Sequence, residues 1–359
     1  MIPLLVDLEQ EWRGGQNQFF LLLKGLYERG HAAELLTAKG SSLGHRAAKA
    51  GICVHYTSRG SLRLKAAGAV KALMSDGRFD LVHVNESHAL TAAWLARAHR
   101  QVPLIISRRV GYPIGQGFFS RARFNAAARI VANSEWVLEQ AVASGAPREK
   151  LTVIYEGVEI PAAVTPEVRK VARKRWGVRA SQQLLGCAGV LLEDKGQEWV
   201  IRALGKLRPE FPDCRLLLAG EGAYRPQLES LVKELNLQDA VIFAGFVRDV
   251  ESFYQALDVF VFPALFEGLG TSLLAAMAHA IPSVTYFGCA LGEIVEDHIS
   301  GLQVEPRNPD ILAEAIQKIL GDPNFAERLA SSGRQRIGEI FSADRMVDRT
   351  FRLYREVSG

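Results

Sequence analysis

The chain has 359 residues, which is long for one domain, and its 48% hydrophobic and 23% charged residues are ordinary for a globular protein. No apolar run approaches the roughly 20 residues of a membrane-spanning helix. Met1 to Leu8 is too short for a signal sequence, so we expect a cytoplasmic protein. The four cysteines are scattered without a C-x-x-C pair, which favours reduced core thiols.

The formal net charge of +4 is distributed unevenly along the chain. Residues 1–160 hold 20 lysines and arginines against 13 acidic residues, whereas residues 161–359 hold 23 against 26. A basic first half suggests an anionic partner. A phosphorylated acceptor, a lipid surface and nucleic acid are candidates, and a solvated surface without a partner is the alternative.

Apolar β-rich runs alternate with helical patterns through the first half, which is typical of a parallel sheet covered by helices. The first expected strand is Ile2 to Val6, and the first expected helix is Phe19 to Arg29. Ser134 is expected to cap a helix over residues 135–144. The further expected strands are 33–37, 52–56, 80–85, 104–107, 128–133 and 152–156.

Several residues follow these strands, at the edge where open α/β sheets place ligands. Gly14 and Gly15 lie in the loop after the first strand. His88 lies past the strand over 80–85, and Arg108 and Arg109 lie at the end of the strand over 104–107. Arginine presents a planar fork of donors suited to phosphate or carboxylate. We therefore take His88, Arg108 and Arg109 as possible phosphate or acceptor contacts, with a structural role as the alternative.

Basic and aromatic residues are interleaved just beyond these arginines. The basic residues are Arg121, Arg123 and Arg129, and the aromatic residues are Phe118, Phe119 and Phe124. Such a segment suits docking on a membrane surface. A helix packed by its own aromatic rings is the alternative.

The alternation of strands and helices resumes after a linker over residues 161–166. The expected strands are 184–189, 215–220, 241–245, 258–262 and 282–286. Lys195 follows the first of them, Gly220 and Gly222 follow the second, and Phe246 to Arg248 follow the third. Because residue 225 is arginine, there is no G-x-G-x-x-G motif, which disfavours a dinucleotide-dependent dehydrogenase.

The chain is organised around the stretch that follows the strand over 258–262. Its loop carries Glu267, then Gly268 and Gly270, and a helix is expected to begin at Thr271 or Ser272. Glycines permit a close backbone approach, and the first helical turn offers free N–H groups and partial positive charge to an anion. Glu267 could accept hydrogen bonds from neutral hydroxyls. This combination suits a sugar nucleotide, although an ordinary strand-to-helix turn has the same pattern.

The Glu267-Gly-Leu-Gly270 sequence resembles the signature of retaining glycosyltransferases of family 4, which have the glycosyltransferase-B fold and include enzymes of bacterial lipopolysaccharide and cell-surface glycan synthesis. Further resemblance lies at Gly14-Gly15, Lys195, Gly220-Glu-Gly222 and in the stretches 80–85, 131–134, 153–158 and 292–301. The resemblance implies two Rossmann-like parallel-sheet domains facing across a cleft. We expect an acceptor domain over residues 1–160, a donor domain over 161–340 and a helix over 341–359 that crosses back to the first domain.

The resemblance also implies roles for individual residues. Glu267 would contact the donor sugar, and Lys195 would bind the diphosphate; we take both as catalytic. Gly14 and Gly15 would face the donor phosphates. The other implied donor-binding residues are Gly220, Gly222, Phe246, Arg248, Gly268, Leu269, Gly270, Thr271 and Ser272.

Two positions depart from the family pattern. The second glutamate, which binds the nucleotide ribose in the family, is replaced here by Ala275. An arginine that binds the diphosphate is replaced by Val190. Losing one preorganised donor typically costs about 3–4 kcal/mol in the transition state. We expect Arg108 or Arg109 to substitute for the missing arginine.

No D-x-D sequence occurs, so no metal is expected, and the only co-substrate implied is a nucleotide sugar, UDP- or GDP-linked. The expected function is retaining sugar transfer to a glycan, lipid-linked or phosphorylated acceptor, at the inner face of the cytoplasmic membrane. Nucleic acid is not an expected partner. The alternative is a non-catalytic binding or scaffold relative with a degraded donor site; a phosphorylase or epimerase of similar fold is a further one.

Overall fold

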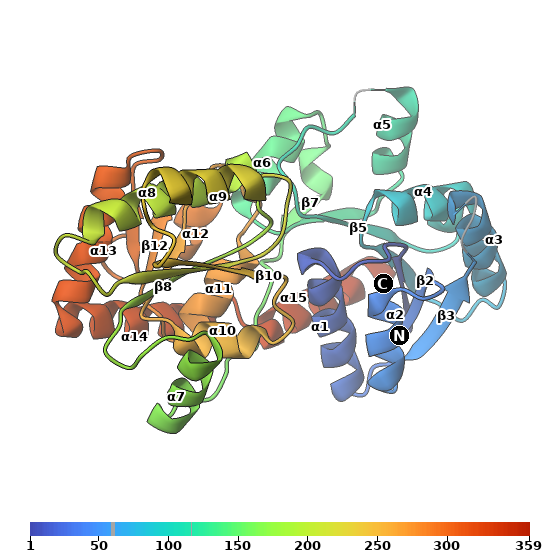
Figure 1. Ribbon diagram of the computed structural model, residues 1–359. Helices are drawn as coiled ribbons and strands as arrows, with labels where there is room; N and C mark the ends of the chain where they lie inside the picture. Colours follow the sequence, from blue (N-terminus) through green and yellow to red (C-terminus); the bar gives the residue numbers. More distant parts are fainter. Residues whose placement is uncertain (59–61, 116) are drawn as a thin grey trace. The chain divides into compact units, whose positions relative to one another are not determined.

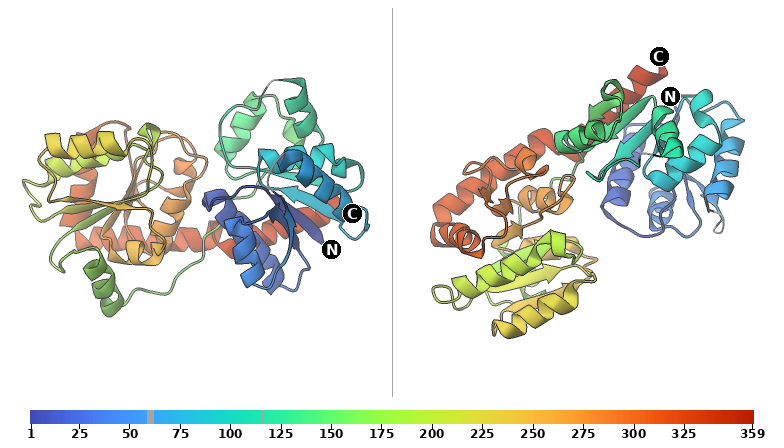
Figure 2. Two further views of the ribbon diagram at one scale, coloured as in Figure 1. Left: turned by 45° about the vertical axis from the view of Figure 1, so that its right-hand side comes forward. Right: turned by 90° about the horizontal axis from the view of Figure 1, so that it is seen from above.

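A computed structural model describes residues 1–58, 62–115 and 117–359 (Figure 1). The chain forms two compact units, of which the first comprises Met1–Gly157 with Ser342–Gly359 and the second comprises Val158–Phe341. Each unit contains one parallel sheet. Figure 2 shows helices on both faces of each sheet. The predicted α/β class with two Rossmann-like domains is thereby confirmed.

The sheet of the first unit has the strand order β3-β2-β1-β4-β5-β6-β7. Its strands are β1 (Pro3–Asp7), β2 (Glu34–Ala38), β3 (Cys53–Thr57), β4 (Leu81–Val84), β5 (Leu104–Arg108), β6 (Arg129–Ala132) and β7 (Leu151–Val153). Its helices are α1 (Gly14–Glu28), α2 (Ser42–Lys49), α3 (Leu62–Met74), α4 (Ser87–Leu95), α5 (Phe118–Asn125), α6 (Glu135–Ala143) and α15 (Ala343–Ser358), with short 3-10 turns at Ala98–Arg100 and Arg148–Lys150.

Gly14 and Gly15 form the first turn of α1, so the expectation of a loop at this point was wrong. The helix begins five residues earlier than the predicted Phe19, and the Asn17 N–H donates to the Arg13 carbonyl at 3.0 Å within that first turn. Glycines are poor helix formers, so their presence concealed the true start of the helix.

The sheet of the second unit has the strand order β10-β9-β8-β11-β12-β13. Its strands are β8 (Leu184–Ala188), β9 (Arg215–Ala219), β10 (Val241–Gly245), β11 (Val259–Phe262), β12 (Ser283–Tyr286) and β13 (Leu302–Val304). Its helices are α7 (Pro166–Arg175), α8 (Gln197–Leu207), α9 (Arg225–Glu234), α10 (Val250–Ala256), α11 (Thr271–Ala278), α12 (Leu291–Ile294), α13 (Pro309–Gly321) and α14 (Pro323–Ile340), and a 3-10 turn covers Glu193–Lys195.

In both sheets the chain first adds strands on one side of its first strand, β1 or β8, and then continues on the other side. In the first unit the chain proceeds from β1 to β2 and β3, and then crosses to β4 on the other side of β1. In the second unit it proceeds from β8 to β9 and β10, and then crosses to β11. The loops after β1 and β4, and those after β8 and β11, therefore diverge at a topological switch point. Such points are where open α/β sheets bind ligands.

The last helix, α15, completes the core of the first unit. Helix α15 packs on α1 in a buried cluster through Met346, Val347 and Leu353. Gly25 of α1 permits this close packing, because a Cβ there would lie 2.5 Å from the Val347 side chain. The Tyr354 hydroxyl lies 2.6 Å from His83 Nδ1, while His83 Nε2 lies 2.8 Å from the Ser107 hydroxyl. These two contacts give His83 of β4 a structural role in the core of the first unit.

None of the helices that the structure describes is both long and apolar enough to cross a membrane.

The burial of His83 generates a pH-dependent prediction. Burial lowers its pKa from 6.5 to about 3, so below pH 6.5 the unfolded chain binds a proton that the folded chain does not. We expect the stability advantage of the wild type over His83→Gln to be constant above about pH 7 and to shrink below about pH 6.5 by about 1.4 kcal/mol per pH unit. Urea unfolding of both proteins measures this difference, in which all other titrating groups cancel. A difference that does not change with pH would contradict it.

Candidate functional site

The predicted donor residues of the second unit gather at the carboxyl edge of its sheet. Lys195 follows β8, Gly220 and Gly222 follow β9, Phe246 follows β10, and Glu267 follows β11. Because all these strands are parallel, their carboxyl ends meet at one edge. Lys195 and Glu267 belong to the two loops that diverge at the switch point between β8 and β11.

The ammonium group of Lys195 contacts the Glu267 loop directly. Its Nζ lies 3.0 Å from Glu267 Oε2 and donates to the Phe266 carbonyl at 3.1 Å. The side chains of Lys195 and Glu267 are 22% and 24% exposed, so a ligand can still reach both. Glu267 Oε1 accepts a hydrogen bond from the Gly268 N–H at 3.1 Å. A fixed cation and a fixed acceptor thus lie side by side.

Backbone contacts fix the two loops against each other. The Leu265 N–H donates to the Asp194 carbonyl at 2.8 Å, one residue from Lys195. Gly196 has a φ of +70°, and a Cβ there would lie 2.2 Å from the Pro263 carbonyl oxygen. No side chain fits at that distance, so a glycine at 196 is required for the turn at Lys195 to lie against the loop after β11.

Gly220 and Gly222 have a similar structural explanation. A Cβ at Gly220 would lie 1.9 Å from the Gly189 carbonyl oxygen, and one at Gly222 would lie 2.2 Å from the Leu191 carbonyl oxygen. These glycines allow the loop after β9 to pack on the loop that carries Lys195. The predicted role in donor binding is not needed to explain them, although they lie at the same edge of the sheet.

Helix α11 begins directly after Glu267-Gly-Leu-Gly. Gly270 is its N-cap residue with a φ of +94°, and no side chain among the described residues caps the helix. Thr271 and Ser272 are half-buried, whereas Leu269 is 1% exposed and packs into the protein. The first turn contains no acidic residue. This helix start therefore presents backbone N–H groups and partial positive charge beside Lys195.

Sequence reasoning missed one neighbour of this loop. Cys289 follows β12, the strand beside β11, and its thiol donates to the Leu265 carbonyl at 3.1 Å. Burial raises the pKa of the Cys289 thiol, so it stays protonated. The sequence could have indicated Cys289, because it follows an expected strand and so lies at the same edge of the sheet as Glu267.

The two departures from the family pattern place apolar side chains where the family has charged ones. Val190 is 53% exposed and Phe246 is 60% exposed, both at this edge, and Arg248 is exposed. Ala275 is half-buried and lies one helical turn after Thr271. Neither the side chain of Val190 nor that of Ala275 can supply a charge or a hydrogen bond.

The first unit has its own polar cluster at the carboxyl edge. Asp7, at the end of β1, accepts hydrogen bonds from Asn85 Nδ2 at 2.5 Å and from Gln16 Nε2 at 2.9 Å. Burial raises the pKa of Asp7. Arg109 lies 2.5 Å from Glu156 through its Nε, and its Nη1 donates to the Asn85 carbonyl at 3.2 Å.

The structure brings Gly15 and Arg109 together, because a Cβ at Gly15 would lie 3.7 Å from Arg109 Cδ. The charge of Arg109 is balanced by Glu156. Arg108 differs, since its Nη2 donates to the Tyr112 carbonyl while its Nε is buried with no hydrogen-bond partner among the described residues. Burial lowers the pKa of the Arg108 guanidinium. Unlike Arg109, Arg108 forms no ion pair with a carboxylate among the described residues.

His88 lies in the first turn of α4, where its Nδ1 accepts a hydrogen bond from Arg63 Nε at 2.8 Å. The preceding Glu86 caps this helix by accepting from the backbone N–H groups of His88 and Ala89. Burial raises the pKa of Glu86 to about 7. His88 thus lies at the predicted edge of the sheet. The hydrogen bond described for its imidazole is with the Arg63 guanidinium.

The tight contact at Gly196 generates a prediction with a matched control. Gly196→Ala should destabilise the protein by clearly more than Gly177→Ala. Gly177 has a similar φ of +65°, but a Cβ there would meet nothing within 4 Å. The control change carries only the left-handed backbone cost of about 1–2 kcal/mol, whereas Gly196→Ala adds a clash with a backbone carbonyl. Denaturant unfolding compares the two variants, and equal losses would show that the loops are not held as described.

Comparison with known proteins identifies relatives of both halves of the chain. A family model described as Glycosyltransferase Family 4 matches residues 12–160, and one described as Glycosyl transferases group 1 matches residues 168–336. An uncharacterized glycosyltransferase of Methanocaldococcus jannaschii is 31% identical over 214 residues, which cover 58% of this chain and 55% of that protein. The chain spans about half the length of that relative and of two further curated relatives.

A lipopolysaccharide core biosynthesis glycosyltransferase of Rhizobium meliloti, LpsE, is 28% identical over 267 residues, covering 73% of this chain and 74% of that protein. Among solved structures, HepE of Anabaena in complex with UDP and glucose has a TM-score of 0.86 and 21% identity, covering 98% of this chain and 99% of that chain. At this identity the similarity concerns the fold alone. From the matched family models, this chain belongs to the group 1, family 4 glycosyltransferases and has their two-domain glycosyltransferase-B fold.

Proposed function

We propose that the protein transfers a sugar from a nucleotide sugar, UDP- or GDP-linked, to a hydroxyl of a glycan or lipid-linked acceptor, with retention of the anomeric configuration. The observation that carries this proposal is the 3.0 Å contact between Lys195 and Glu267 beside the start of α11. It joins a cation, a hydroxyl acceptor and a helix N-terminus within one partly buried site.

Lys195 and the first turn of α11 bind the donor diphosphate in this proposal. The ammonium group supplies a full positive charge, and the backbone N–H groups around Gly270 to Ser272 supply directed donors. Glu267 accepts hydrogen bonds from sugar hydroxyls, since a carboxylate repels the phosphates. The backbone contacts between the two loops hold Lys195 and Glu267 close together, so little reorganisation is needed when the donor binds.

The reaction breaks the bond between the anomeric carbon and the phosphate oxygen, and that electron pair leaves with the diphosphate. The acceptor oxygen forms the new bond to the anomeric carbon, and its proton passes to the departing phosphate oxygen. Lys195 and the α11 amides act by stabilising the charge that develops on the diphosphate. The acceptor must lie about 3–3.5 Å from the anomeric carbon for this step.

The donor is proposed to bind without a resident metal. The described residues form two groups of side chains close enough to share a metal ion, and both belong to the first unit, whereas Lys195 and Glu267 belong to the second: Glu34, Cys53 and His55; Glu9, Glu86 and His88. The ammonium group and the helix start take the place of a cation at the diphosphate.

The names of relatives support the substrate classes in this proposal. HepE was solved with UDP and glucose, and LpsE acts in lipopolysaccharide core biosynthesis. Of the two proposed donors, the HepE complex supports the UDP-linked one, and LpsE supports a lipid-linked glycan as the acceptor. In the first unit, Arg108 is the proposed contact for a phosphate on the acceptor, because its charge has no carboxylate partner among the described residues, whereas Arg109 pairs with Glu156.

A non-catalytic binding or scaffold protein is the second candidate, and Val190 and Ala275 favour it. Both positions lack the charged group of the family pattern. A catalytic protein should release nucleoside diphosphate from its donor slowly even without acceptor, whereas a binding protein should retain the donor intact.

Substitution at Lys195 and Glu267 tests the proposed donor site. Lys195→Met and Glu267→Gln should each lower kcat/KM for nucleoside diphosphate release by about 10²–10³. Lys206→Met is the control, because Lys206 lies in α8 of the same unit and pairs with Asp310 at the surface. Coupled detection of the released diphosphate measures the rates. Wild-type rates in both variants would refute the assignment, and donor binding without any release would favour the binding protein.

We also propose that the first unit docks on an anionic membrane surface at the inner face of the cytoplasmic membrane. In α5, Phe118 is 79% exposed and Phe119 is 68% exposed. Arg121 and Arg123 follow in the same helix, which contains no acidic residue. Exposed aromatic rings beside arginines are the features with which surface helices bind anionic lipids.

Vesicle binding tests this docking. Phe118→Ser combined with Phe119→Ser should reduce co-sedimentation with phosphatidylglycerol vesicles by at least about tenfold, since two large rings leave the interface. Ile299→Ser, which removes a side chain 60% exposed in the second unit, should leave binding unchanged. Equal binding to neutral phosphatidylcholine vesicles, or no loss in the double variant, would contradict the proposal.

A further inference from the structure

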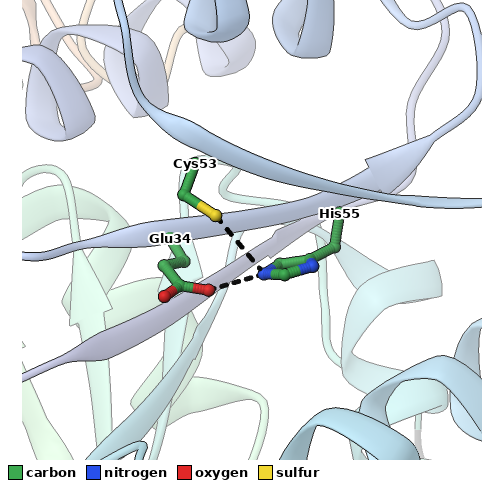
Figure 3. Close-up of side chains that lie close together, drawn as sticks. All are labelled: Glu34, Cys53 and His55. Carbon is green, nitrogen blue, oxygen red and sulfur yellow. Dashed lines mark hydrogen bonds and ion pairs between the residues drawn. The ribbon is translucent and has the colours of Figure 1, made fainter.

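Three potential metal ligands lie together at the amino ends of β2 and β3, outside the sites described above (Figure 3). Glu34 begins β2 and is paired in register with Cys53, which begins β3. His55 lies two residues after Cys53 and therefore projects from the same face of β3. The sheet itself thus brings a carboxylate, a thiol and an imidazole to one place.

The spacing of these groups approaches that of a tetrahedral metal centre. Cys53 Sγ lies 3.7 Å from His55 Nε2, and His55 Nε2 lies 2.5 Å from Glu34 Oε2. Zinc bonds of about 2.3 Å to sulfur and 2.0–2.2 Å to nitrogen and oxygen place tetrahedral ligand atoms roughly 3.4–3.6 Å apart. The sulfur–nitrogen pair already has this separation, and the oxygen–nitrogen pair must open by about 1 Å.

Burial and charge favour a cation at this cluster. Glu34 is only 8% exposed, so its carboxylate requires a positive partner. Arg78 supplies that partner, with both Nη atoms donating to the two oxygens of Glu34. The Arg78 side chain itself is 37% exposed, so it can withdraw into solvent. Cys53 is exposed, which gives an ion a route to the three ligands.

We propose that Glu34, Cys53 and His55 bind a divalent transition metal ion of the zinc class, with water completing the coordination. Carboxylate, thiolate and imidazole are the ligand types that Zn²⁺ prefers. The metal replaces Arg78 as the positive partner of Glu34 and displaces the thiol proton to solvent. This proposal does not depend on the proposed glycosyl transfer, because the cluster lies at the edge of the sheet opposite to its carboxyl ends.

The position of the cluster indicates what such an ion does. β3 is an edge strand, paired only with β2 in the sheet order of the described residues. A metal bonded to Glu34 on β2 and to two residues of β3 cross-links that edge strand to the sheet. Binding therefore stabilises the first unit, and the gain in its free energy of unfolding grows with the logarithm of the ion concentration above Kd.

Titration of the untagged full-length protein with Zn²⁺ against a competing chelator tests the proposal. We expect one equivalent to bind, and Co²⁺ at the same site to give thiolate-to-cobalt charge-transfer absorption. Cys53→Ser should abolish that absorption, and both Cys53→Ser and His55→Gln should weaken Zn²⁺ binding by at least about tenfold. Cys289→Ser is the thiol control and should leave the absorption unchanged.

Arg78→Gln provides a test with the opposite sign. Removing the competing guanidinium should strengthen Zn²⁺ binding by about tenfold, because the metal no longer has to displace it. Misfolding cannot mimic a gain in affinity. Failure to bind one equivalent of Zn²⁺, absorption that survives Cys53→Ser, or unchanged or weaker binding in Arg78→Gln would each overturn the proposal.

Discussion

The contact between Lys195 and Glu267 depends on how two loops of one parallel sheet are held together. The residues are 72 positions apart, and only the adjacency of β8 and β11 brings them within 3.0 Å. An ion pair of partly exposed side chains contributes little stability by itself. Its geometry is instead fixed by the backbone, through the Leu265 to Asp194 hydrogen bond and the close approach permitted at Gly196. The scaffold thus holds two charged groups that would otherwise be mobile.

The features that could be predicted from the sequence are those that depend on local periodicity and on the order of the strands along the chain. Buried strands, their alternation with helices and the place of Glu267 after β11 all follow from patterns a few residues long. The pairing of Lys195 with Glu267 is compatible with those patterns, since both residues follow parallel strands. What could not be predicted is pairing between distant side chains. The Glu156 partner of Arg109 and the Tyr354 partner of His83 lie 47 and 271 positions away, and no local signal marks them.

The same limitation affects the interpretation of charge. The first half of the sequence is basic, which suggested an anionic partner, but several of its arginines are used inside the first unit. Arg29 pairs with Asp344 and Asp348 of α15, and Arg78 and Arg109 pair with buried glutamates. Because α15 is distant in sequence, its acidic residues were counted with the other half. The positive charge available to a partner is therefore smaller than the count suggested and is best represented by Arg108 and α5.

Under the proposed function, Val190 and Ala275 change which part of the donor is recognised. Both remove groups that would contact the nucleotide, one at the diphosphate and one at the ribose. Lys195, the α11 amides and Glu267 remain, and they face the diphosphate and the sugar. The exposed side chains of Val190 and Phe246 offer the nucleotide only apolar contact, which discriminates poorly between bases. Donor selectivity in this chain should therefore be set by the sugar at Glu267, because that is where the directional hydrogen bonds are retained.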